Sequence, residues 1–208
     1  MEKHTVSASL TDNTKYMNRA LPVKKSFDII ERTLIIGGQN SAFYFIDGFT
    51  KDEIMLKLMD SFLNISADDM PEDATSFSTS CIPYVEVDIL GDFDSIFKNL
   101  LSGVTCLFID GYEAAIAIDC RTYPSRSIEE PDKDKSLRGS RDGFVETIVF
   151  NTALMRRRIR DPHLIMEMYE AGTSTRTDVA LCYMSDRVDR ELLTTIQNKL
   201  EESKSQDL

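Results

Sequence analysis

The sequence predicts an α/β protein of two small α/β subdomains, each a short mixed sheet with packed helices, joined by a polar linker. The chain has 208 residues and 42% hydrophobic content, which is enough to form a core. Short apolar runs alternate with stretches of helical spacing. The segment PSRSIEEPDKDKS, residues 124–136, is charged and contains two prolines, so it can add little to a core.

These observations predict four regions. Residues 1–23 have no sustained apolar period and are expected to be a mobile N-terminal arm, with one short helix before Pro22. Residues 24–123 form the first subdomain, residues 124–137 the linker and residues 138–208 the second subdomain.

The first predicted elements are a hairpin and a helix. Apolar runs at 33–36 and 41–46 flank the sequence Gly-Gly-Gln-Asn at 37–40, which is typical of two strands joined by a turn. Thr50 and Glu53 have the spacing of a capping box. The apolar residues that follow repeat on one helical face: Ile54, Met55, Leu58, Met59 and Phe62.

A strand, a helix and a second hairpin complete the first subdomain. Val85, Val87 and Ile89 alternate with acids, the pattern of a half-buried strand. Asp92 or Asp94 should cap a helix that ends at Gly103. The apolar runs 104–109 and 114–118 flank Asp-Gly at 110–111, which predicts a hairpin with a two-residue turn.

The second subdomain is expected to contain two helices and two strands. The first helix covers residues 144–159, and the strands cover 164–169 and 179–184. A C-terminal helix carries Leu193, Ile196 and Leu200 on one face.

Composition argues against several classes of function. The net charge of -11 and the pI near 4.7 predict repulsion of nucleic acid and of anionic lipid. The four cysteines form no Cys-x-x-Cys pair, so we expect a reducing compartment with neither a zinc site nor a redox site. The N-terminus has no signal-peptide core and no run of 18 apolar residues occurs, so we expect a cytosolic chain that does not span a membrane.

No residue pattern predicts catalysis, a metal or a cofactor. The chain has only two histidines, His4 and His163, and no Gly-x-Ser-x-Gly motif. Gly37-Gly38 lacks the third glycine of a dinucleotide fingerprint. The eight acids between Ser66 and Ser95 lack the spacing of an EF-hand and are interpreted as a solvated face. We therefore expect a protein that is not an enzyme and binds no cofactor.

The arginine-rich segment is the main functional candidate. Residues 138–160 hold six arginines and two acids, inside an acidic chain. Helical residues are about 100° apart, so three consecutive arginines cannot all face one anionic surface. Phe144, Ile148, Met155 and Ile159 share a face and should form the core side, with the arginines flanking it. Ion pairing within the protein or between subunits is favoured over ligand capture, and the candidate surface comprises Arg138, Arg141, Asp142, Glu146, Arg156, Arg157, Arg158, Arg160 and Asp161.

Two glycines before this helix leave a second interpretation open. Gly139 and Gly143 bracket Ser-Arg-Asp, so backbone amides there could bind an anion at the helix N-terminus. A bend that joins the linker to the helix is the favoured interpretation.

The sequence RGSRDGFVETIVFNTALMRRRIRDP, residues 138–162, with TDVALCYMSD after it, resembles the GerA family of spore-germination proteins. Weaker likeness extends the resemblance over residues 24–200. The resemblance implies two α/β subdomains and a soluble N-terminal region of a membrane protein of the spore inner membrane, placed on the cytoplasmic (spore core) side. We expect the chain to end before the membrane region.

The resemblance implies a non-catalytic domain that serves regulation and assembly of a germinant receptor or ion-release complex. The expected partners are other subunits of a receptor or channel complex, with a possible homo-oligomer of the full-length protein and no nucleic acid. Membrane contact is expected only through the C-terminal region that this chain lacks. The alternative is a domain that senses a small ligand, an amino acid or an ion, in the cleft between the subdomains.

Overall fold

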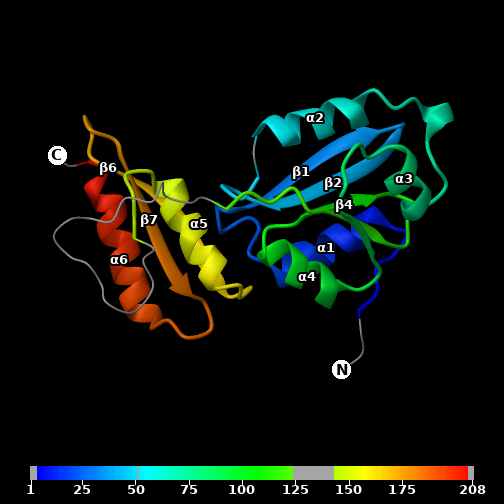
Figure 1. Cartoon of the computed structure of the whole chain (residues 1–208). Coiled ribbons are helices and arrows are strands. Elements are labelled where there is room, and N and C mark those ends of the chain that lie inside the picture. Colours follow the sequence, from blue (N-terminus) through cyan, green and yellow to red (C-terminus); the bar gives the residue numbers. More distant parts are fainter. Residues whose placement is uncertain (1–3, 51, 124–142, 206–208) are drawn as a thin grey trace, which may run out of the picture.

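The computed structural model describes residues 4–50, 52–123 and 143–205 (Figure 1). They form a larger unit, residues 4–123, with a five-stranded sheet, and a smaller unit, residues 143–205, with a two-stranded sheet. The predicted α/β class with two parts is confirmed. Mixed sheets were expected, but every strand pair in the described residues is antiparallel. Short hairpin turns can join only antiparallel neighbours, which explains the difference at three of these pairs.

The predicted linker, residues 124–137, lies outside the described residues. The division of the chain into segments 24–123 and 138–208 therefore stays a prediction.

The sheet of the larger unit has the strand order β1-β2-β4-β5-β3. Its strands are β1 (Ile29–Ile36), β2 (Gln39–Ile46), β3 (Val87–Leu90), β4 (Thr105–Ile109) and β5 (Ala115–Ile118). The first hairpin is confirmed: Gly37 and Gly38, both with positive φ, form the turn between β1 and β2.

The second hairpin has a longer turn than predicted. Leu107 pairs with Ile116, and residues 110–114 separate β4 from β5. The Asp110 carboxylate accepts a hydrogen bond from the Leu10 amide at 2.8 Å, and the Gly111 amide donates to Ala8 O at 2.7 Å. These contacts with the N-terminal segment are tertiary, so local turn chemistry could not indicate them.

Helices cover both faces of this sheet (Figure 1). Helices α2 (Asp52–Leu63) and α3 (Ala74–Ser80) cover one face, with the 3-10 turn Ala67–Asp69 between them. Helices α1 (Leu10–Ala20) and α4 (Phe93–Leu101) cover the other. Each face therefore has its own hydrophobic cluster.

The predicted start of α4 is confirmed, whereas the predicted start of α2 is not. Asp92 caps α4 as expected, because its side chain accepts from the Ser95 amide at 2.9 Å. The capping box at Thr50 is wrong. Thr50 pairs with Arg121 in an isolated β-bridge, and its Oγ1 is buried without a hydrogen-bond partner. This bridge connects the chain before α2 to the segment after β5.

The N-terminal segment is packed, which corrects the expectation of a mobile arm. The short helix before Pro22 is present as α1, and Met17 and Leu21 are fully buried against the sheet. The Val6 amide also bonds to Gly91 O at 3.0 Å. The large apolar side chains of this segment are few, but those of the described residues all belong to the core cluster or pack against it: Val6, Leu10, Tyr16, Met17, Leu21 and Val23.

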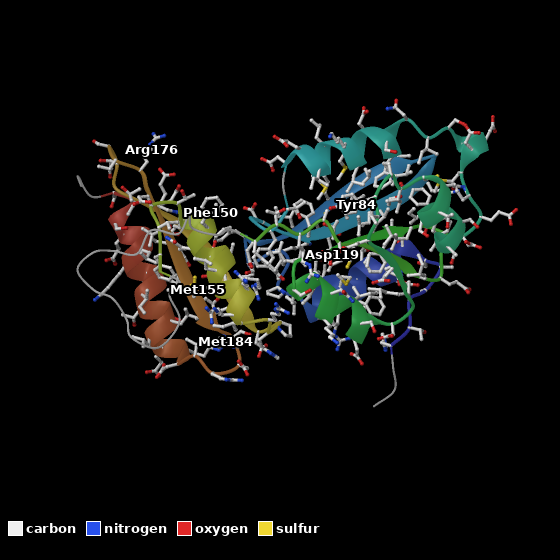
Figure 2. The ribbon with its side chains drawn as sticks, in the orientation of Figure 1. Tyr84, Asp119, Phe150, Met155, Arg176 and Met184 are labelled. Carbon is white, nitrogen blue, oxygen red and sulfur yellow. The ribbon has the colours of Figure 1, made fainter. Side chains whose placement is uncertain are left out.

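The smaller unit contains α5 (Ile148–Arg158), β6 (Leu164–Ala171), β7 (Thr177–Met184) and α6 (Arg190–Ser203). Leu193 of α6 packs with Ile165 and Tyr183 on one face of the sheet. Helix α5 lies on the side that faces the larger unit (Figure 1). Arg176 in the turn between β6 and β7 and Met184 at the end of β7 lie at opposite ends of this unit (Figure 2).

Candidate functional site at the junction of the two units

Helix α5 carries the arginine-rich sequence to the junction. The side chain of its N-cap residue, Thr147, makes no capping hydrogen bond. Asn151 instead closes the preceding turn: the Val145 amide donates to Asn151 Oδ1, and Asn151 Nδ2 donates to Val145 O, both at 2.7 Å. Residues 156–158 form the basic last turn, where the helix dipole favours positive charge.

Arg156 is fully buried at the junction and reaches into the larger unit. Its Nε donates to Asp28 Oδ2 at 2.7 Å, and its Nη2 donates to Asp28 Oδ1 at 3.2 Å. Nη2 also donates to Leu164 O at 2.9 Å, and Nη1 donates to Asp161 O at 3.0 Å. Every guanidinium nitrogen has an acceptor, so hydrogen bonds offset the cost of removing this charge from water.

Asp28 is held in place by its own neighbours. It is 1% exposed, and its Oδ1 accepts from Ser26 Oγ at 2.5 Å. Its carbonyl accepts from the Asp47 amide at 2.8 Å. Ser26 Oγ accepts from the Met166 amide, and the Phe27 amide donates to Met166 O, both at 2.9 Å. Hydrogen bonds within the junction thus hold the Asp28 carboxylate in the position in which it pairs with Arg156.

A second polar group joins the units on the opposite face of β6. Lys25 Nζ lies 3.2 Å from Glu167 Oε1, which also accepts from Tyr183 at 2.9 Å. Glu167 Oε2 accepts from Tyr169 at 2.8 Å and Gln197 at 2.7 Å. Burial by itself would raise the pKa of Glu167, but these hydrogen bonds outweigh it and lower the pKa. The anionic carboxylate is therefore the stabilised form.

Residues Lys25–Asp28, which we name the junction segment, lie along the edge of β6. Met166 and Glu167 are successive residues of the strand β6, so their side chains face opposite sides of the sheet. Lys25 meets Glu167 on the α6 side, whereas Asp28 meets Arg156 on the α5 side. The junction segment thus holds β6 from both faces and bonds to its backbone at Met166.

The other side of α5 touches the loop after β2 closely. Ala153 is fully buried and belongs to the hydrophobic cluster of the larger unit. Gly48 has φ +78°, and a Cβ on it would lie 3.2 Å from Ala153 Cβ and from Val149 Cγ1. Only glycine allows this approach without displacing the helix.

Tyr123, the last described residue of the larger unit, adds an aromatic contact. Its hydroxyl donates to Ser102 O at 2.9 Å, and its ring packs edge-on against Phe49 at 5.2 Å between centroids. The Arg157 guanidinium lies 4.5 Å from the centre of the Tyr123 ring. This cation–π contact is a further link between α5 and the larger unit.

The junction residues bind one another, and nothing in their arrangement resembles a catalytic group. No group of three or more metal-ligating side chains occurs among residues 4–50, 52–123 and 143–205. A shallow hollow of about 460 Å³ lies elsewhere in the smaller unit, lined by Tyr169, Gly172, Lys204 and their neighbours. The contacts at the junction attach one unit to the other.

The whole junction lies within a region shared with known proteins. Residues 15–208 match the family model described as Bacillus/Clostridium GerA spore germination protein. The chain belongs to the GerA family. This match includes the junction segment, Arg156 and Glu167.

Two relatives from Bacillus subtilis show how far the GerA likeness extends. The chain is 32% identical over 200 residues to stage V sporulation protein AF, covering 96% of this chain and 41% of that protein. It is 28% identical over 201 residues to the uncharacterized membrane protein YfkQ, covering 96% of this chain and 39% of that protein. The chain thus spans about two fifths of the length of these relatives.

A solved structure has the same fold. The N-terminal domain of the A subunit of the Bacillus megaterium spore germinant receptor GerK3 matches with a TM-score of 0.71 and 20% identity. The match covers 100% of this chain and 75% of that one. Within the described residues, no helix is both long enough and apolar enough to cross a bilayer.

The structure separates the residues of the predicted arginine surface. Arg138, Arg141 and Asp142 lie outside the described residues. Arg156 is buried in the junction, and the backbone carbonyl of Asp161 accepts a hydrogen bond from it. The Asp161 carboxylate instead accepts from the His163 amide at 2.8 Å, which lowers the pKa of Asp161. The others are exposed: Glu146, Arg157, Arg158 and Arg160.

The predicted core face of α5 is wrong. Phe144 is 66% exposed and Ile159 is 39% exposed, whereas Thr152, Ala153 and Arg156 are buried. Helix α5 packs against the rest of the smaller unit on one side and against the larger unit on the other. It therefore has no single apolar stripe. Its least expected side chain, an arginine, is its largest buried one.

Asp28 was missed by sequence reasoning. The predicted partners of the arginines were the local acids Asp142, Glu146 and Asp161, but Asp28 is 128 residues from Arg156. One signal was present: an aspartate directly before the apolar start of β1. A charge beside a buried apolar residue such as Ile29 needs a counter-ion.

Proposed function

We propose that this chain is a non-catalytic N-terminal domain that serves assembly and regulation of a germinant receptor or ion-release complex. Membership of the GerA family and the fold shared with a receptor A-subunit domain support this role. The observation that carries it is Arg156, whose buried pair with Asp28 joins the two units. The pair holds the most basic segment of the chain against the larger unit. Such a contact suits a domain that presents its surfaces in a fixed orientation.

The exposed arginines of α5 and of the loop after it are the proposed contact with another subunit. Arg157, Arg158 and Arg160 form a basic surface on a chain of net charge -11. Opposite charge on a partner would steer association and set its orientation. The partners are proposed to be other subunits of a receptor or channel complex, with self-association of the full-length protein also possible.

The proposed location is the spore inner membrane, with this region on the cytoplasmic (spore core) side. YfkQ, named a membrane protein, supports attachment to a membrane through a part that this chain does not include. Binding of an amino acid or ion in the cleft between the units has less support. Where the units meet in the described residues, the buried side chains of Arg156, Asp28 and Ser26 fill the space.

Charge reversal tests the assembly role. Arg157→Glu with Arg158→Glu in the full-length protein should weaken co-purification of the subunits and slow germination, since attraction becomes repulsion. The matched control is Arg32→Glu with Arg176→Glu, because both side chains are exposed and neither lies in α5 or in the loop after it. Arg176 lies at the tip of the smaller unit, away from the larger unit (Figure 2).

Both double variants must first retain the wild-type circular dichroism spectrum as the 208-residue chain. Normal assembly and germination of the Arg157/Arg158 variant would contradict the proposal. Equal loss in the control variant would also contradict it, because the effect would then follow net charge and not the α5 surface.

A further inference from the structure

The smaller unit has a small core of its own. Its own cluster consists of Ile165, Tyr183 and Leu193, with Leu181 and Val188 packed against it. A two-stranded sheet is at best marginally stable in water, and domains of this size gain little from a single core. The smaller unit is thus poorly equipped to stay folded by itself.

Part of what is buried in the smaller unit is buried by the larger one. Ala153 of α5 joins the cluster around Phe49 and Tyr44. Arg156 is covered together with Asp28, a residue of the larger unit. One layer of the smaller unit, α5, is therefore completed only by contact with the larger unit.

The junction segment, which forms a turn and not a strand, bonds to the free edge of β6. It accepts from the Met166 amide through Ser26 Oγ and donates to Met166 O through the Phe27 amide. It supplies the cation to Glu167, which in turn binds Gln197 of α6. The segment therefore reaches β6 directly and α6 through one side chain.

We propose that docking and folding of the smaller unit are a single cooperative event, controlled by the junction segment Lys25–Asp28. When the segment leaves β6, the smaller unit loses its order as a whole and does not swing away as a rigid body. The junction is then an order–disorder switch through which the larger unit controls the order of the smaller one. This inference goes beyond the proposed receptor role and does not depend on it.

The larger unit should not take part in this opening. Both faces of its sheet have their own clusters, around Phe43 and Phe62 on one side and Tyr44 and Phe108 on the other. Neither cluster contains a side chain of β6, β7 or α6. Its central strands β2 and β4 can therefore remain protected while the smaller unit opens.

Native-state hydrogen exchange of the whole chain in low denaturant tests the proposal. In the unmodified chain, amides of β6, β7 and α6 should exchange through one common opening that is more frequent than the opening of β2 and β4. Asp28→Asn leaves Arg156 without its buried counter-ion. It should raise exchange of β6, β7 and α6 together by about 10-fold or more, with β2 and β4 unchanged.

Asp47→Asn is the matched control. Asp47 is bonded to Asp28 through its backbone amide, but its carboxylate has no hydrogen bond to the smaller unit. Burial raises the pKa of Asp47, with the charges of Asp28 and Asp52 adding to the rise, so removing its charge should not harm the fold. Exchange in α6 should stay at the wild-type rate.

Two results would overturn the proposal. In one, Asp28→Asn speeds exchange only beside Met166 while α6 keeps its protection, which is the behaviour of an autonomous unit on a hinge. In the other, β2 and β4 lose protection together with α6, which makes the molecule one cooperative unit. If Asp28→Asn fails to fold, the milder Ser26→Ala decides by the same criterion: joint loss in β6, β7 and α6 alone supports the proposal, and either other pattern refutes it.

Discussion

The larger unit buries side chains on both faces of a five-stranded sheet, whereas the smaller unit has a compact cluster on only one face of a two-stranded sheet. On its other face, the smaller unit presents Arg156 to a carboxylate of the larger unit. This difference indicates that the smaller unit depends on the larger one for its stability. Two hydrophobic clusters can keep the larger unit folded, whereas the smaller unit has one cluster and needs the contacts across the junction for its stability.

Removal of the buried arginine should have the largest effect on the stability of the smaller unit. Arg156→Met leaves Asp28 charged, buried and unpaired, so the free energy of unfolding of the smaller unit should fall by about 3–5 kcal/mol. Hydrogen exchange of the β6, β7 and α6 amides across a series of urea concentrations would measure it, because these amides report on the smaller unit alone.

The double variant Arg156→Met with Asp28→Asn serves as the control. It removes the charge that the single variant leaves unpaired, so it should recover part of the lost stability. If the double variant were less stable than Arg156→Met, an unpaired buried charge could not be the reason for the loss.

A smaller effect is expected where α5 touches the loop after β2. Gly48→Ala and Gly111→Ala both place a side chain at positive φ, which costs about 1–2 kcal/mol. A Cβ at Gly48 also meets Ala153 and Val149, whereas a Cβ at Gly111 meets nothing within 4 Å. Gly48→Ala should therefore lower the free energy of unfolding further than Gly111→Ala, by about 1 kcal/mol or more. Equal losses in thermal unfolding would show that α5 does not pack tightly on the larger unit.

The smallest effect concerns acid. The folded-state pKa of Glu167 is lowered from an ordinary value of 4.5, so its stabilising contribution is present above about pH 4.5 and is lost as pH falls through the folded-state pKa. Stability of the smaller unit should decline in this range, and Glu167→Gln should flatten the decline. Unfolding free energies from pH 7 to pH 3 in both proteins would measure it, and parallel curves would contradict a role for this carboxylate.

Local signals in the sequence were sufficient for most elements. The glycine pair at 37–38 indicated the first hairpin because a tight turn needs positive φ. Asp92 indicated the start of α4 because a carboxylate caps free amides. The alternating and helical apolar periods gave the class of the fold, and the segment at 138–162 gave the family, since each of these features depends on neighbours in the chain.

The tertiary structure decided what the arginines do. Helical geometry showed that Arg156, Arg157 and Arg158 point in different directions, but only the folded chain shows that Arg156 points inward to Asp28. It likewise decided that the N-terminal helix joins the core and that Asp110 binds the N-terminal segment. The physical reason is the same in each case. Burial and charge pairing depend on which distant residue arrives opposite, and periodicity describes only which side of its own element a residue faces.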